Sequence, residues 1–475
     1  MTAQSDLEIQ LKKEIEGDVL FDRFSRGRYA TDASIYQMLP LGTVVPKTFE
    51  DVEITLEVAR NAGVPVLPRG GGTSQSGQTV NEAVVIDFTK HLNQIVEVHA
   101  DTETAIVEPG LVLDQLNIAL KNKGLWFPVD VSTASRATLG GMAANNSCGA
   151  RSFRYGIMRD NVRAIDALLP DGLKVRFGDV PDNLARNDRP EGLGQLSRDL
   201  LDFGAREAEE IRARFPDLMR RVGGYNIDAL IPGGPANNLA ELLVGSEGTL
   251  AITRQLTLKL APVLGSKTIG ICHFPTFFEA MDNTRHLVDL GPTAIELMDR
   301  NMIDLGREIP MFRPIVDAFV KGNPAALLMV EFAEDDQKEN LRRLAKLHDR
   351  MADLGFRWGD PGKKEGGVVD AIEPAFQNQI MEVRKQGLNI MMSMKSDGKP
   401  VSFIEDCAVR LEDLADYTDR LTGIFDKYGT EGTWYAHASV GTLHVRPVLN
   451  LKLDQDVTKM RAIAEEAFEM VREYK

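Results

Sequence analysis

A glycine-rich stretch is the first pattern in the sequence that could do chemistry. It consists of Pro68, Arg69, Gly70, Gly71, Gly72, Thr73 and Ser74. Consecutive glycines let several backbone amides approach a ligand, because no side chain blocks the way and positive φ is allowed. Its spacing matches neither the GxGxxG fingerprint nor a Walker P-loop. Taken alone, the stretch fits a flexible turn at least as well as a site for a phosphate-bearing ligand.

Two further stretches are rich in small and polar residues. The first runs from Thr138 to Gly149, and its candidate binding residues, with two that follow it, are Thr138, Gly140, Gly141, Asn145, Asn146, Ser147, Tyr155 and Gly156. Small residues allow close approach to a flat ring, and Asn and Ser supply donors and acceptors for its polar edge. The second is Gly245–Ile252, with candidates Glu247, Gly248 and Ile252. Alone, the first fits a tight packing contact equally well, and the second fits a plain turn before a strand.

Histidine and arginine residues near the end of the chain form another group of candidates. His437 and His444 are seven residues apart, and Arg446 follows His444 by two, which on a strand places both on the same face. Arg384 and Arg446 have the planar guanidinium that suits a carboxylate. Lys399 is a weaker candidate for the same role. The alternative for each is an ordinary histidine near a turn or a solvated surface charge.

Composition limits what this chain does. The 475 residues carry a net charge of -15, which argues against binding nucleic acid through broad electrostatics. Three widely spaced cysteines form neither a disulfide framework nor a metal-spaced set. The polar start has no apolar signal core, and no segment offers about 18 uninterrupted apolar residues. These features predict a cytoplasmic protein, with peripheral contact at the inner membrane face left open.

The elements that position the candidates follow from the apolar patterns. Thr48 and Asp51 have capping-box spacing ahead of a helix that Gly63 ends. Strands are expected at 42–45, 64–67, 83–88, 95–98, 104–107, 164–169, 173–177, 250–260, 268–274 and 325–332, and a helix over 454–475 that runs to the end of the chain. This mixture predicts an α+β protein with a domain boundary near residue 262.

In this order and spacing, the three small-residue motifs resemble the FAD-binding domain of the p-cresol methylhydroxylase (PCMH) type, the vanillyl-alcohol oxidase superfamily. The resemblance covers roughly residues 38–262, after a lead-in of residues 1–37. Residues 263–475 resemble the cap domain of the D-lactate dehydrogenase, glycolate oxidase and D-2-hydroxyglutarate dehydrogenase branch, through Ala294–Asp299 and His437–His444. The resemblance implies a two-subdomain FAD-binding domain followed by an α+β cap domain.

The resemblance also implies cofactors. Some relatives attach the flavin to a histidine within the glycine turn; this chain has Thr73 there, so the FAD is expected to be non-covalent. In the family's cap, two histidines in the positions of His437 and His444 bind a divalent, zinc-like metal that holds the substrate. The residues between them here, Ser-Val-Gly-Thr, depart from the family's usual Gly-Asp-Gly-Asn. Arg384 resembles the family's substrate-binding arginine.

A third metal ligand and a catalytic histidine usually follow in a Glu-His-Gly motif. No histidine follows His444 here. The match of Trp434–Asn450 is to long fused proteins that carry an iron–sulfur domain, so the cap is expected to be incomplete at its C-terminal end.

The leading hypothesis is therefore FAD-dependent oxidation of a small D-2-hydroxy acid to the 2-oxo acid, with electrons passed to an iron–sulfur partner or a quinone. Lactate, glycolate and 2-hydroxyglutarate are the candidate substrates. One alternative is a non-redox flavoenzyme of the alkyl-dihydroxyacetone-phosphate synthase type, which shares the fold. Another is a non-catalytic FAD-binding fragment or subunit.

Overall fold

A computed structural model describes residues 3–179, 193–233 and 238–474. The chain divides into two compact units. The first unit comprises Met1–Gly149, Tyr155–Pro216 and Val222–Val263, and the second comprises Ala150–Arg154, Asp217–Arg221 and Leu264–Lys475.

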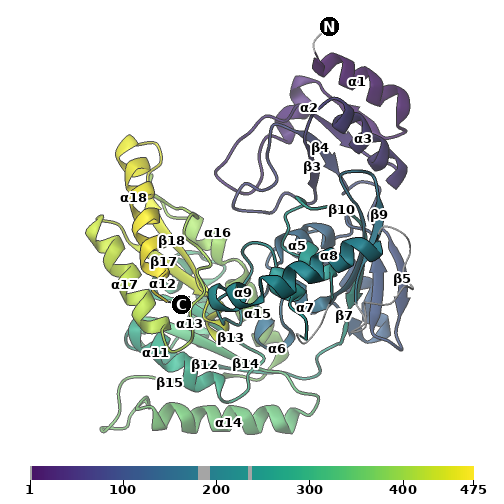
Figure 1. The fold of residues 1–475 in the computed structure, drawn as a ribbon. Helices are drawn as coiled ribbons and strands as arrows, with labels where there is room; N and C mark the ends of the chain where they lie inside the picture. The colour runs from purple at the N-terminus through teal and green to yellow at the C-terminus, as the bar shows by residue number, and fades with distance from the viewer. Residues whose placement is uncertain (1–2, 180–192, 234–237, 475) are drawn as a thin grey trace. The chain divides into compact units, whose positions relative to one another are not determined.

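The first unit begins with a four-stranded sheet in the order β1-β2-β4-β3. Its strands are β1 (Asp18–Leu20), β2 (Gly42–Val45), β3 (Val66–Arg69) and β4 (Val84–Asp87). Strands β2, β3 and β4 run parallel, and β1 pairs antiparallel with β2, so the lead-in contributes a strand to this sheet. Helices α1 (Ala3–Glu14), α2 (Arg23–Arg28) and α3 (Phe49–Asn61) accompany it, in purple in Figure 1. The predicted capping box of Thr48 and Asp51 is present at the start of α3.

A five-stranded antiparallel sheet forms the rest of this unit's framework, in the order β5-β6-β10-β8-β9. Its strands are β5 (Ile95–His99), β6 (Thr104–Val107), β8 (Val162–Leu168), β9 (Lys174–Phe177) and β10 (Ile252–Lys259), and a short pair joins β7 (Leu125–Trp126) to β11 (Ala261–Pro262). A hairpin around Pro170-Asp171-Gly172 joins β8 to β9, which were both expected as strands. The helices of this part are α4 (Leu113–Leu120), η1 (Lys121–Lys123), α5 (Leu139–Asn145), α6 (Ser152–Tyr155, which begins in the second unit's residues), α7 (Met158–Asn161), α8 (Leu193–Arg206), α9 (Ala208–Arg214), η2 (Ile227–Leu230) and α10 (Ala240–Leu243).

The second unit is organised around a seven-stranded antiparallel sheet in the order β15-β12-β14-β13-β17-β18-β16. Its strands are β12 (Thr268–Phe274), β13 (Ala294–Asp299), β14 (Ala326–Phe332), β15 (Gly367–Ala371), β16 (Lys399–Pro400), β17 (Gly432–Ala436) and β18 (His444–Leu449). Successive side chains on β14 alternate between two hydrophobic clusters: Leu328 and Val330 belong to one, and Leu327 and Met329 to the other. Both faces of the sheet are therefore covered, which explains why its central strands are apolar throughout.

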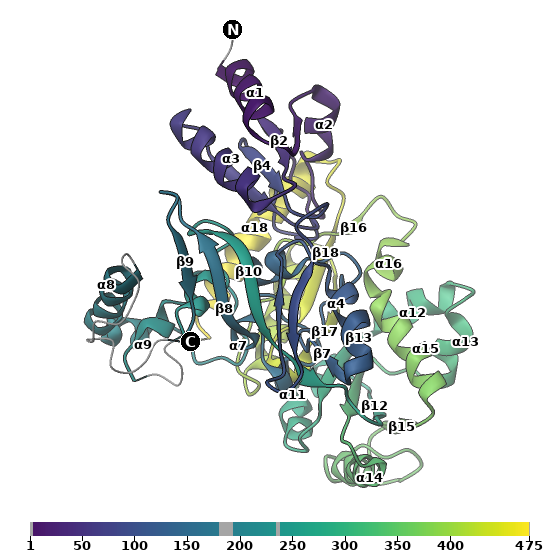
Figure 2. The same cartoon turned by 90° about the vertical axis from the view of Figure 1, so that its right-hand side faces the viewer.

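Helices cover both of those faces. The first cluster includes residues of α11 (Phe277–Val288), α14 (Gln337–Asp353), α17 (Leu414–Lys427) and α18 (Asp454–Val471). The second includes residues of α12 (Arg300–Glu308), α13 (Arg313–Phe319), α15 (Pro374–Lys385) and α16 (Gly387–Met392), and Figure 2 shows α12, α13 and α15 grouped together. A short helix, η3 (Ala438–Val440), links β17 to β18. The predicted α+β class is confirmed.

One prediction about the terminal helix is wrong. Helix α18 ends at Val471, with Arg472 as its C-cap, and does not run to the end of the chain. The backbone N–H of Glu473 and of Tyr474 each bond three residues back, to Met470 and Val471, which closes the last turn tightly. The Tyr474 ring then packs edge-on against Tyr417 of α17, with centroids 5.9 Å apart. Tertiary packing ends this helix where the sequence has no Gly or Pro.

Candidate functional site

The glycine-rich turn follows β3 and packs closely against the segment that leads into α5. A Cβ on Gly70 would clash with Thr138 Oγ1, and one on Gly71 would clash with the carbonyl oxygen of Arg136. Within the described part of the chain, the backbone N–H groups of residues 70–74 donate to no protein acceptor. A loop with several free amides and no intervening Cβ fits the oxygens of a diphosphate.

The Arg69 side chain holds this turn in shape. Its guanidinium donates to three backbone carbonyls, those of Tyr29 (3.1 Å), Thr79 (2.9 Å) and Thr31 (2.7 Å). Burial lowers the pKa of Arg69. Arg69 therefore fixes the loops on either side of the turn, and its donors are already in use.

The second and third motifs meet at Glu247. Asn145 Nδ2 and Gln78 Nε2 both donate to Glu247 Oε1, at 3.0 and 3.3 Å. The backbone N–H of Glu247, a residue with φ of 53°, donates to the carbonyl of Ala144 at 2.9 Å. Burial raises the pKa of Glu247. Because Gln78 lies just beyond the glycine turn, this carboxylate ties all three motifs together within the first unit.

Other candidate residues of these motifs have structural contacts of their own. Thr138 is the N-cap of α5 and accepts from the Gly141 N–H at 3.3 Å. Asn146, with φ of 55°, accepts through Oδ1 from the Arg159 N–H at 3.0 Å. Ile252 is buried in a hydrophobic cluster. Gly140 packs on Pro109, and Gly248 approaches Pro68. Ser147 Oγ donates to Asn145 Oδ1 at 3.2 Å, Tyr155 packs edge-on against Trp126, and Gly156 has φ of 76°.

In the second unit, a buried ion cluster forms around Glu296 on β13. Glu296 Oε1 lies 2.9 Å from Nδ1 of His437, which directly follows β17, and Oε2 is ion-paired with Arg384 of α15. Burial alone would raise the pKa of Glu296, but Arg384 and His437 lower it to about 2. Burial is the main reason that the pKa of His437 is lowered to about 4, so its imidazole is neutral near pH 7. A neutral ring that gives its Nδ1 proton to Glu296 leaves Nε2 as an acceptor.

A second set of ion pairs involves the loop after β16. His444 Nδ1 lies 2.6 Å from Asp406 Oδ1, and Arg446 is ion-paired with Glu405 through its Nε. Glu405 and Asp406 lie in a turn, and Asp406 has a left-handed backbone with φ of 64°. Burial alone would raise the pKa of Asp406, but His444 and Arg220 lower it. The turn, strained at a non-glycine residue, directs the Asp406 carboxylate to His444 and the Glu405 carboxylate to Arg446.

The two histidines form a pair, as predicted. Their ring centroids are 5.1 Å apart and the rings are nearly perpendicular, at 71°. Each ring has Nδ1 against a carboxylate, an arrangement that proteins use to orient metal-binding imidazoles. A metal site needs at least a third protein ligand, and the described residues include no group of three or more His, Cys, Asp or Glu side chains placed to hold one. The pair alone does not make a metal site.

The predicted carboxylate-binding residues are already partnered. Arg384 is paired with Glu296 and Arg446 with Glu405, and Lys399 Nζ donates to the carbonyl of Met394. The cation that sequence reasoning missed is Arg220, which is 4% exposed and whose charge acts on both Asp406 and His437. Nothing in its local sequence, Met219-Arg220-Arg221-Val222, distinguishes it from a surface arginine.

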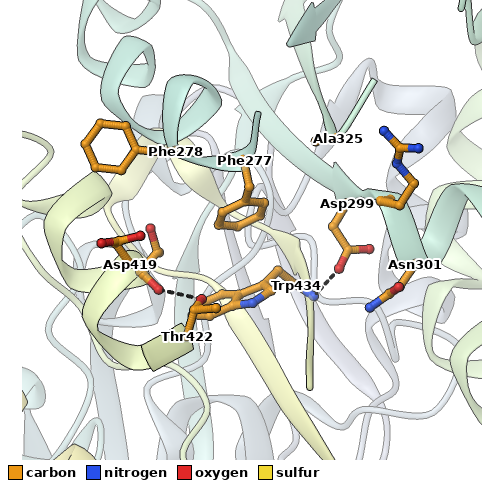
Figure 3. A pocket seen from close by; sticks show the side chains of 10 residues that line it. Phe277, Phe278, Asp299, Asn301, Ala325, Asp419, Thr422 and Trp434 are labelled. Carbon is orange, nitrogen blue, oxygen red and sulfur yellow. Dashed lines mark hydrogen bonds between the residues drawn. The ribbon is translucent and has the colours of Figure 1, made fainter. Parts of the chain in front are cut away.

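A separate pocket of about 270 Å³ also lies in the second unit and contains none of the predicted site residues. Figure 3 shows the Phe277 and Trp434 side chains in it, together with Asp299, whose carboxylate accepts from the Trp434 backbone N–H at 2.8 Å. Asp299 also caps α12 by accepting from the Met302 N–H. Burial raises the pKa of Asp299 to about 7, although these two N–H donors oppose the rise.

Comparison with known families identifies the class of protein. The FAD binding domain family matches residues 40–178, and the family of C-terminal domains of FAD linked oxidases matches residues 265–475. The chain therefore belongs to the flavoprotein family built from these two domains, as the three motifs predicted.

The chain is similar in sequence to several proteins that are named for the 2-hydroxy acids they act on. The chain is 31% identical over 477 residues to D-2-hydroxyglutarate dehydrogenase of Pantoea ananatis, covering 96% of this chain and 45% of the relative. It is 25% identical to glycolate oxidase subunit GlcD of Bacillus subtilis, covering 96% of this chain and 84% of that protein. It is 27% identical to D-lactate dehydrogenase of Archaeoglobus fulgidus, covering 86% and 75%. The chain spans about half the length of the D-2-hydroxyglutarate dehydrogenases it matches.

Solved structures share the fold. An alkyldihydroxyacetonephosphate synthase aligns with a TM-score of 0.66 at 16% identity, covering 99% of this chain and 83% of that one. p-Cresol methylhydroxylase with substrate bound aligns with a TM-score of 0.68 at 13% identity, covering 98% and 87%. These likenesses confirm the PCMH-type fold. None of the helices described here combines the length and apolarity needed to span a bilayer.

Proposed function

We propose that this protein binds FAD non-covalently in its first unit and oxidises a small D-2-hydroxy acid to the 2-oxo acid. The observation that carries the proposal is the pair of histidines, the buried His437 and the partly exposed His444, each with Nδ1 set against a carboxylate, in a chain of this flavoprotein family. Relatives whose names specify D-2-hydroxyglutarate, D-lactate or glycolate support the same class of substrate.

Oxidation of the alcohol requires one acceptor for the hydride and a second acceptor for the hydroxyl proton that the substrate loses. Oxidation of the C2 alcohol breaks the C2–H bond with its electron pair and the O–H bond with its proton. Bound FAD would supply the two-electron acceptor for the hydride. The neutral His437 presents Nε2 as an acceptor for the hydroxyl hydrogen, because Glu296 holds its Nδ1 proton.

The ion pairs give this site its shape. Arg384 compensates Glu296, and Glu296 in turn fixes the His437 ring, so Arg384 acts on the substrate's hydroxyl through two other side chains. Arg446 and Glu405 form an equivalent pair in which neither group is left as a free buried charge. Held in this way, the rings need little rearrangement when a substrate binds.

The fate of the electrons belongs to the same proposal. We expect them to leave the flavin for an iron–sulfur partner or a quinone.

The oxidation is tested by steady-state assays with D- and L-lactate, glycolate, and D- and L-2-hydroxyglutarate, each with a reducible dye as the electron acceptor. Turnover of at least one D-2-hydroxy acid is expected. Full FAD loading with no turnover of any of them would favour a non-catalytic flavin-binding role, and flavin-dependent chemistry without net reduction of the dye would favour the non-redox class.

A divalent metal on the same two histidines would occupy their Nε2 atoms, because both Nδ1 atoms face carboxylates. It is therefore an alternative to hydrogen acceptance by His437 within this proposal, and it requires its own measurement. Elemental analysis of the purified protein, beside the His437→Ala and His444→Ala variants, tests it. Zinc-like metal at about one equivalent, lost in both variants, would support a metal held by this pair and by a ligand from outside the described residues. Substoichiometric metal that is unchanged in the variants would remove the metal from the account.

A further inference from the structure

Arg220 is a deeply buried cation that lacks a partner. Its residue surface is 4% exposed, and its Nε and Nη1 have no hydrogen-bond partner in the described part of the chain. No carboxylate oxygen there lies within ion-pair distance of it. Removing a guanidinium from water without an anion to receive its donors is costly, so a group in this state usually has a ligand.

Arg220 belongs to the site described above. The segment Asp217–Arg221 packs with the second unit, which also holds Glu296, Asp406 and His437. The positive charge of Arg220 acts on both the Asp406 carboxylate and the His437 ring. The neighbouring cations differ from it, because Arg384 and Arg446 each have a glutamate partner.

We infer that Arg220 is a substrate-binding residue that receives a carboxylate group of the 2-hydroxy acid. This inference rests on the proposed function, because it assigns a role within the same site. The substrate's carboxylate would supply the anion that Arg220 lacks, and the guanidinium would hold that carboxylate while the hydroxyl bonds to the histidine pair. No bond is made or broken in this step; it is binding alone.

Three variants test the assignment. Arg220→Gln removes the charge, Arg220→Lys keeps it without the planar fork, and Arg221→Gln is a matched control that removes a charge from the adjacent residue. FAD content and the midpoint of thermal unfolding are measured first, to show that each variant folds. Binding of oxalate, an unreactive anion, is then followed through the visible spectrum of the flavin, and KM and kcat are measured with the best hydroxy acid.

We expect the loss of the Arg220 charge to weaken substrate binding and to leave turnover nearly unchanged. In Arg220→Gln, the Kd for oxalate and the KM should each rise at least about tenfold, with kcat changed by less than about threefold. For Arg220→Lys, the Kd and the KM should lie between those of Arg220→Gln and those of the unsubstituted protein. For Arg221→Gln, both should match the values of the unsubstituted protein. Unchanged Kd and KM in Arg220→Gln, or no oxalate binding to the unsubstituted protein, would overturn the assignment.

The two proposals fail in different ways. If no hydroxy acid reduces the flavin but oxalate binds in a manner that depends on Arg220, the anion site stands and the oxidation is wrong. If hydroxy acids are oxidised and Arg220→Gln behaves like Arg221→Gln, the oxidation stands and the role of Arg220 is wrong.

Discussion

His437 and Glu296 are 141 residues apart in the sequence, yet Nδ1 of the one lies 2.9 Å from Oε1 of the other inside the second unit. The pairing of β13 with β17 brings them together, since the register sets Leu297 opposite Ala436. Arg384 occupies the other oxygen of Glu296. Three buried side chains from three separate elements therefore act as one unit.

Removing the charge of Glu296 should destabilise the fold and abolish oxidation. Glu296→Gln leaves Arg384 buried without its anion, which is expected to lower the free energy of unfolding by about 3–5 kcal/mol. Urea unfolding measures this. Glu465→Gln is the control, because Glu465 forms an ion pair with Arg461 in solvent and its loss should be undetectable. Equal effects in both variants would show that the Glu296 cluster contributes no more than a surface pair.

A methyl group in the glycine turn should weaken FAD binding. The Cβ of Gly71→Ala would meet the carbonyl oxygen of Arg136, and the shift needed to relieve the clash is expected to cost about 1–3 kcal/mol, or about 5- to 150-fold in FAD affinity. The FAD-to-protein ratio after gel filtration measures it. Gly27→Ala is the control, since a Cβ there has open space around it. Full FAD content in Gly71→Ala would mean that the turn does not approach the cofactor.

The flavin should be free of any covalent bond to the protein. Thr73 occupies the turn where some relatives carry a histidine, and a threonine hydroxyl is a poor nucleophile at neutral pH. Acid precipitation should therefore release all the yellow colour into the supernatant. Colour that stays with the pellet after washing would contradict this prediction.

Asp299 should make stability depend on pH. Its pKa is raised to about 7 in the folded state, against about 4 in the unfolded chain, so the folded protein keeps a proton that the unfolded chain releases. The free energy of unfolding should therefore fall as pH rises from about 4 to 7, by about 1–4 kcal/mol from this group.

The difference between the unsubstituted protein and Asp299→Asn isolates that contribution. Urea unfolding at pH 5 and pH 8 should show the unsubstituted protein losing stability relative to the variant at the higher pH. A difference that stays constant between the two pH values would mean that Asp299 is ionised throughout.

Local patterns predicted much of this fold. Strands β6 and β12 have the expected bounds, Thr104–Val107 and Thr268–Phe274, because runs of β-branched and apolar residues flanked by turn residues leave few alternatives. Strand β3 begins later than expected, at Val66, because its pairing with β4 starts there. Tertiary pairing sets the ends of a strand, and its partner is invisible in the local sequence.

The candidate site was predictable in its residue types and much less in its contacts. The family resemblance predicted that His437 and His444 act as a pair, but their carboxylate partners lie on β13 and in the turn after β16. Arg220 was missed because neither its burial nor the assignment of Asp217–Arg221 to the second unit is visible in the local sequence. Glu405 and Asp406 lie in a turn in which Asp406 has a left-handed backbone, and this turn sets their carboxylates against Arg446 and His444.

The central claim, that this flavoprotein oxidises a 2-hydroxy acid, is tested most directly by anaerobic titration. The purified protein with its bound FAD is mixed without oxygen with D- and L-lactate, glycolate, and D- and L-2-hydroxyglutarate, and the visible absorbance of the flavin is recorded. We expect at least one D-2-hydroxy acid to bleach the oxidised flavin band, with formation of one equivalent of the 2-oxo acid. A fully loaded flavin that none of these acids bleaches would contradict it.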